Sequence, residues 1–159
     1  NMPAKSKMNK PEYLYIKNNQ LGVHEDAEKI VKVIAGKFEK AEGPEKGHNV
    51  DPIYFHVILE EGKDFKCDVP GSHNSFVYLL TGDLSIGENK HDKTSNSNLI
   101  LLDRGNKLIL KANKKSEFLF IAGKPIGEPI ARGGPFVMNT KAEILQAVQD
   151  YHNGTFAKY

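Results

Sequence analysis

The segment GKPIGEPIARGGPFVMNT at residues 123–140 has the most distinctive composition in the chain. Its eighteen residues include three prolines and four glycines. Proline lacks a backbone donor and glycine has no side chain to pack, so this composition excludes a regular helix and a central strand. Because Pro135 is followed by three large apolar residues, Phe136, Val137 and Met138, we expect an ordered connection that lies on an apolar surface.

A helix is predicted immediately after this segment. Thr140 and Glu143 have capping-box spacing, in which each side chain satisfies a backbone amide of the other residue. Gly154 can adopt the left-handed conformation that ends a helix. An apolar stripe at helical spacing is formed by Ile144, Leu145, Val148 and Tyr151. Such a stripe needs a covering surface, either the chain's own sheet or a neighbouring barrel.

Three motifs in the connection, GKP, EPI and GPFVMNT, occur in the same order as in a known family. They are followed by AEILQAVQDYHNGTF at residues 142–156, and FVYLLTG lies upstream at residues 76–82. The chain thereby resembles the pirin family, whose members carry two cupin barrels in one chain. The resemblance reaches back to about residue 11 and implies that this chain corresponds to the C-terminal half of a complete pirin.

Upstream of the connection the chain reads as a series of short strands. Residues 53–60 alternate so that one face is wholly apolar, which is typical of a strand beside a core. Local patterns favour an antiparallel sandwich or barrel. The other strands are predicted at residues 12–17, 29–35, 64–69, 75–80, 84–87, 99–102, 107–111 and 117–122, with a turn at 81–83 and loops at 38–52 and 88–98.

The fold class implied by the resemblance is all-β, a cupin-type double-stranded β-helix or jelly-roll barrel with one C-terminal α-helix. Residues 1–11 are predicted to form a flexible arm, and residues 12–159 a single domain. Aromatic side chains at alternating strand positions are expected in the core. These aromatic residues are Tyr54, Phe55, Phe65, Phe76, Tyr78, Phe118 and Phe120.

Composition excludes several classes of function. The chain has 22 basic and 20 acidic residues, and its net charge of +2 gives no reason to expect nucleic-acid binding. No apolar run approaches the length of about 20 residues that a membrane span requires. A signal-peptide pattern is absent as well, so a cytoplasmic location is predicted. A single cysteine, Cys67, cannot form an internal disulfide.

A metal site is not expected in this barrel. Metal-binding cupins present two histidines, a glutamate and a further histidine, and the resemblance places Cys67, Val69 and Asn74 near the first three of these positions. In pirins the metal ligands belong to the N-terminal barrel. The weak candidates are His56, His73 and Cys67: if both histidines pointed inward, they could share a divalent metal such as iron with Cys67 or with a carboxylate, Glu60 or Glu61. The other histidines, expected in loops or near a helix end, are His24, His48, His91 and His152.

Two functions from different classes follow from these observations. The first is a non-catalytic binding or assembly module that acts as a homodimer or as a partner of a separate pirin-like N-terminal half. This hypothesis also allows a small-molecule ligand to bind inside the barrel. Its predicted interface consists of Phe136, Val137, Met138, Ile144, Val148 and Tyr151. The second is a metal-dependent dioxygenase of the quercetinase type, an activity that the resemblance implies for some complete members.

Glu128 is expected to pair with Arg132 or with a backbone amide.

Overall fold

The structure is a computed structural model, and it describes residues 2–45, 49–88, 92–95 and 97–156. The chain forms two compact units. Ile16–Pro125 make up the first, which we call the sandwich unit. Asn1–Tyr15 and Ile126–Tyr159 make up the second, which we call the terminal unit.

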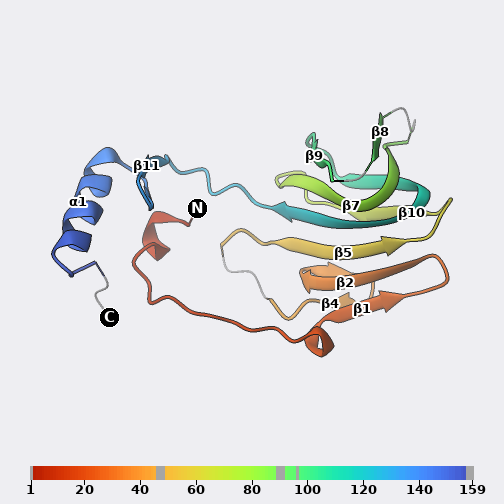
Figure 1. Ribbon diagram of the computed structural model, residues 1–159, viewed down its shortest axis with the longest axis horizontal. Helices are drawn as coiled ribbons and strands as arrows, with labels where there is room; N and C mark the ends of the chain where they lie inside the picture. The colour runs from red at the N-terminus through yellow and green to blue at the C-terminus, as the bar shows by residue number, and fades with distance from the viewer. Residues whose placement is uncertain (1, 46–48, 89–91, 96, 157–159) are drawn as a thin grey trace. The chain divides into compact units, whose positions relative to one another are not determined.

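The sandwich unit is an eight-stranded antiparallel sheet, as far as the described residues show, that folds over on itself. Its first layer runs in the order β1, β2, β5, β10, β7 and β9, and most of these strands lie one above another in Figure 1. The bounds of the strands are β1 Gly22–Glu25, β2 Lys29–Ala35, β5 Ile53–Leu59, β7 Asn74–Ile86, β9 Leu99–Leu102 and β10 Lys107–Gly123.

Two long strands, β7 and β10, carry the chain from the first layer into the second. The register between them shifts at Ala112, Lys114 and Glu117, and such irregularities bend a sheet. Beyond the bend, β10 pairs with β6 (Asp64–Asp68) and β7 pairs with β8 (Asp92–Ser95). A small hairpin of β3 (Lys37–Phe38) and β4 (Ala41–Glu42) and a short 3-10 turn, η2 (Asn18–Gln20), complete this unit.

The space between the two layers is filled by phenylalanine and aliphatic side chains. Phe65 and Phe118 meet edge to face with ring centres 5.5 Å apart, and the Phe55 and Phe120 rings lie 6.0 Å apart. All four are fully buried, as predicted. Alternation along β5 places Phe55, Val57 and Leu59 inward, which confirms the apolar face predicted for this strand.

Three aromatic residues were wrongly assigned to this core. Tyr54, Phe76 and Tyr78 face away from the buried side, because each alternates with fully buried neighbours such as Phe55 and Val77. Alternation divides a strand into two faces, and in β7 both faces carry large apolar residues, so the pattern could not identify which face joins the core. Tyr54 lies on the face of β5 that also carries His56, and this polar neighbour was the signal that it points away from the core.

Other local predictions were also wrong. Residues 12–17 form no strand, and the side chains of Tyr13, Leu14 and Tyr15 are largely exposed. The turn expected at residues 81–83 lies inside the continuous strand β7, where Gly82 has a φ of +105° at the bend. The expected loops at 38–52 and 88–98 contain the short strands β3, β4 and β8.

The terminal unit is built around the predicted helix, α1 (Lys141–His152). The capping box is confirmed, because the Glu143 N–H donates to Thr140 Oγ1 at 3.2 Å and the Thr140 N–H donates to Glu143 Oε2 at 2.7 Å. The Thr140 hydroxyl also donates to Glu143 Oε2 at 2.9 Å, and this hydrogen bond, followed by that of the Thr140 N–H, holds the pKa of Glu143 below its ordinary range. The helix packs on a hairpin of β11 (Ala131–Gly133) and β12 (Phe136–Met138). Within the described residues, no helix has both the length and the apolar character needed to cross a membrane.

The first residues of the chain belong to the same unit. A 3-10 turn, η1 (Ala4–Ser6), has Ser6 buried, and the Ala4 N–H donates to Glu128 Oε2 at 2.7 Å. The segment that was predicted to be a flexible arm therefore has defined contacts with the connection after β10. Its mobility in solution stays a prediction.

Candidate functional site

The interior of the sandwich unit is where a cupin barrel would hold a metal ion. The side chains that point into it from β5, β6, β7 and β10 are almost all apolar, and divalent metals in proteins need imidazole, carboxylate or thiolate ligands. In the part of the chain that the structure describes, no three or more His, Cys, Asp or Glu side chains are grouped so that they could hold a metal ion. The residues present do not fit a cupin metal centre.

Cys67 lies in β6 among these core residues. Burial, and secondarily the charge of Asp68, raises the pKa of the Cys67 thiol to about 12. The thiol therefore stays protonated at neutral pH, and Cys67 Sγ donates to the Asp68 carbonyl oxygen at 3.2 Å. A buried, protonated thiol is a small apolar group rather than a ligand or a nucleophile. The other two positions, Val69 and Asn74, are a buried apolar residue and an exposed amide.

His56 points away from the core, which contradicts the condition that both histidines face inward. It alternates with the buried residues Phe55 and Val57. Its Nε2 lies 2.6 Å from Glu117 Oε1, on the neighbouring strand β10. His56 and Cys67 therefore lie on different sides of the sheet and cannot bind one ion together.

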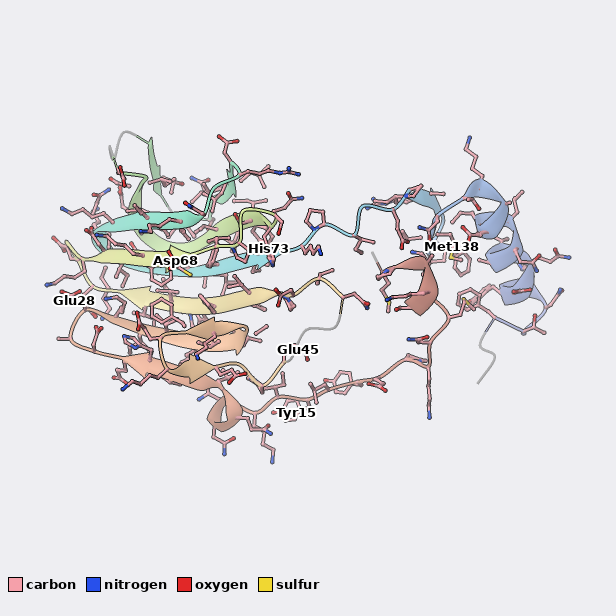
Figure 2. All side chains as sticks on the ribbon, turned by 180° about the vertical axis from the view of Figure 1, so that it is seen from behind. Tyr15, Glu28, Glu45, Asp68, His73 and Met138 are labelled. Atoms are coloured by element: carbon pink, nitrogen blue, oxygen red, sulfur yellow. The ribbon has the colours of Figure 1, made fainter. Side chains whose placement is uncertain are left out.

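His73 is buried near the start of β7 (Figure 2). Its Nε2 lies 2.8 Å from the Asp51 carbonyl oxygen, so the Nε2–H donates to that oxygen. Asp51 has a positive φ of 45°, which is uncommon for a residue other than glycine. His73 therefore has a structural partner in the segment before β5. Of the remaining histidines, His24 lies in β1 and not in a loop, His152 ends α1, and His48 and His91 lie outside the described residues.

The predicted interface residues are all in the terminal unit, but they differ in exposure. Ile144 is buried against Gly133, where an added Cβ would clash with its Cγ2 atom. Val137 and Tyr151 stay exposed, and the Tyr151 ring lies 6.0 Å from that of Phe136. Phe136, Met138 and Val148 are partly buried.

The buried face of the helix consists of Ile144 and Ala147, so the predicted stripe was only partly right. Ala147 was missed because alanine gives a weak apolar signal. Leu145 belongs to the stripe by spacing, yet its side chain is 72% exposed. Beside β12 lies a hollow of about 310 Å³, whose lining residues are Met2, Lys7, Met8, Pro135, Phe136, Val137, Met138 and Phe156.

Within the connection at residues 123–140, the side chains of Glu128 and Asn139 are hydrogen-bonded to each other. Glu128 Oε2 accepts from the Ala4 N–H at 2.7 Å and from Asn139 Nδ2 at 2.8 Å. The predicted pairing of Glu128 with a backbone amide is thereby confirmed. Asn139 Nδ2 also donates to the Pro129 carbonyl oxygen at 3.1 Å. The EPI and GPFVMNT motifs are thus linked directly by hydrogen bonds.

Comparison with known proteins agrees with this architecture. The family model of the pirin C-terminal cupin domain matches residues 54–157. The chain belongs to the pirin family. The predicted all-β cupin fold with a C-terminal helix is confirmed by the same match and by the solved structure of a quercetin 2,3-dioxygenase from Acinetobacter baumannii. That structure is 31% identical, has a TM-score of 0.88, and covers 98% of this chain and 54% of its own.

Curated pirin relatives extend well beyond this chain. A Pseudomonas aeruginosa protein, named as a candidate quercetin 2,3-dioxygenase, is 34% identical over 162 residues, which cover 99% of this chain and 55% of the relative. A pirin-like protein of Caulobacter vibrioides is 34% identical over 158 residues, covering 98% and 56%. The chain therefore spans about half the length of the curated pirin relatives that it matches.

Proposed function

We propose that this chain is a non-catalytic assembly module of the pirin family. It docks onto a second pirin-like cupin barrel, either in another copy of the chain or in a separate N-terminal half. The observation that carries the proposal is the apolar interior of the sandwich unit, filled by Phe55, Phe65, Phe118 and Phe120. Among the described residues, an interior filled in this way lacks the grouped imidazole and carboxylate ligands that a metal ion needs.

The docking surface that we propose is the exposed part of the terminal unit. Val137 and Tyr151 present apolar area to solvent, and the hollow beside them is lined by three methionines, Met2, Met8 and Met138. Methionine side chains are flexible and polarizable, and they adapt to the shape of a partner. Large exposed side chains next to such a hollow are characteristic of protein interaction sites.

The docking proposal is tested by light scattering of the purified chain, alone and mixed with the N-terminal half of a complete pirin. We expect a defined dimer or a one-to-one complex. The double variant Val137→Lys/Tyr151→Lys should weaken this assembly about tenfold, because it places charges in the contact. Leu145→Lys is the matched control, since Leu145 lies on the same helix and is 72% exposed, against 65% for Tyr151.

The proposal would be contradicted if the chain were a monomer and did not bind the N-terminal half. An assembly that the double variant and the Leu145 control weaken equally would also contradict it, because the contact would then lie elsewhere on the chain.

A second candidate function, a metal-dependent dioxygenase of the quercetinase type, is favoured by the names of the similar proteins. It would require a divalent metal such as iron to activate oxygen. Elemental analysis after incubation with iron, nickel, copper and zinc separates the two functions, and we expect substoichiometric metal. Stoichiometric metal that is lost in His56→Ala or His73→Ala, but kept in the exposed control His152→Ala, would favour the enzyme instead.

A further inference from the structure

The outward face of the first layer carries a block of apolar side chains in register across three strands. Leu119 in β10 is opposite Tyr78 in β7, which is opposite Leu99 in β9. A second row lies two residues further along each strand, on the same face. In this row Ile121 of β10 is opposite Phe76 of β7, which is opposite Leu101 of β9. We call these six residues the outer patch.

None of the six residues of the outer patch is charged, and none is fully buried. Leu101 is 77% exposed, Leu99 56% and Tyr78 37%, while the other three are partly buried. An antiparallel sheet with one face on the core usually has a polar opposite face. Single exposed apolar residues are ordinary, whereas a contiguous apolar block indicates a surface that is covered by a partner.

The outer patch ends at an unprotected sheet edge. Within the described residues, β9 pairs only with β7, so its other edge has no partner strand. Its sequence, Leu99-Ile100-Leu101-Leu102, has no charge and no proline. Edge strands in monomeric proteins are normally protected by such residues. An apolar face and an apolar edge therefore coincide at β9.

We infer that the outer patch is the contact surface of a homodimer, in which it meets the same patch of a second copy of this chain. This inference rests on the proposed assembly function and names a second contact, on the sandwich unit. A sheet face packs best on another sheet face, with strands nearly aligned. A two-fold contact brings identical surfaces together, and an uncharged patch has no like charges to repel its copy.

The residues next to the outer patch support a protein partner of this kind. Glu117 lies two positions before Leu119 on β10, and His56 lies opposite Leu119 on β5. Lys32 lies opposite His56 on β2, so the adjoining half of the face carries charges of both signs. An apolar centre with a mixed polar rim is the usual composition of a protein interface. A lipid surface would instead require a basic rim.

The test is analytical ultracentrifugation of the full chain and of the double variant Leu99→Lys/Leu101→Lys. We expect a monomer–dimer equilibrium whose dissociation constant rises about tenfold or more in the variant. Both leucines are exposed, so the variant should fold, and its thermal transition checks this. Val23→Lys is the matched control, because Val23 is 49% exposed on β1, at the opposite edge of the same layer.

Each alternative outcome distinguishes the two proposals. A chain that stays monomeric, that binds only a pirin N-terminal half, or that grows without limit into larger particles would overturn the second-copy inference. A dimer lost in Val137→Lys/Tyr151→Lys but kept in Leu99→Lys/Leu101→Lys would overturn it while supporting the proposed docking surface. The reverse result would support the outer patch and refute docking through the terminal unit.

Discussion

Replacing Phe118 with alanine is expected to lower the free energy of unfolding of the sandwich unit by about 3–5 kcal/mol. Phe118 is fully buried in β10, between Val57 of β5 and Leu79 of β7. Its ring lies 5.5 Å from that of Phe65, at an interplanar angle of 78°. Removal of the ring loses this edge-to-face contact and leaves a cavity that β-strands on both sides cannot easily close.

The loss is measured by urea unfolding followed by circular dichroism. Leu119→Ala is the control, because Leu119 is the next residue on the same strand and faces outward, where it is only partly buried. Its expected cost is about 1–2 kcal/mol. An equal cost at both positions, or a loss below about 1 kcal/mol for Phe118→Ala, would mean that the interior is not packed and would revive the idea of a metal or ligand cavity.

Gly82→Ala is expected to lower the free energy of unfolding by about 2–5 kcal/mol, from two separate causes. The φ of +105° at Gly82 is unfavourable for any residue with a Cβ atom. An added Cβ would also clash with the Ser116 side chain, and it would lie 2.6 Å from the Ser116 Cα and 2.7 Å from the Lys115 carbonyl oxygen. These atoms belong to the bend of β10, so they cannot move aside without disturbing the crossing between the layers.

Gly62→Ala separates the two causes. Gly62 has a φ of +75°, but an added Cβ there would have no atom within 4 Å. Its expected cost is therefore the backbone term alone, about 1–2 kcal/mol. Both variants are compared by urea unfolding. If Gly82→Ala were no more costly than Gly62→Ala, close packing of β7 on Ser116 would not be the reason for the glycine in the FVYLLTG motif.

Much of the secondary structure could be predicted because its signals are local. The alternation along residues 53–60, the capping box at Thr140 and the ordered connection at residues 123–140 depend on neighbours a few positions away. The bend at Gly82 could not be distinguished from a hairpin turn on such signals, since both require a left-handed glycine. What separates them is the partner strand β10, which continues through the bend and is close only in space.

The candidate site was predicted less well than the fold, because it depends on the direction in which each side chain points. His56 and Cys67 are plausible partners in a list of metal-binding residue types, but β5 turns His56 outward and β6 turns Cys67 into the core. The outer patch was missed for the same reason. Its aromatic residues, Phe76 and Tyr78, satisfy the period-two rule on either face.

By itself, the amino-acid sequence determined the family, the all-β class and the C-terminal helix, because motifs and hydrophobic periods are recorded in consecutive residues. Only the tertiary structure decided which of the two apolar faces of β7 and of β9 joins the core and which is left exposed. That choice depends on which strands pair and how the sheet folds over. It is a property of contacts between β5, β7, β9 and β10, which are widely separated along the chain.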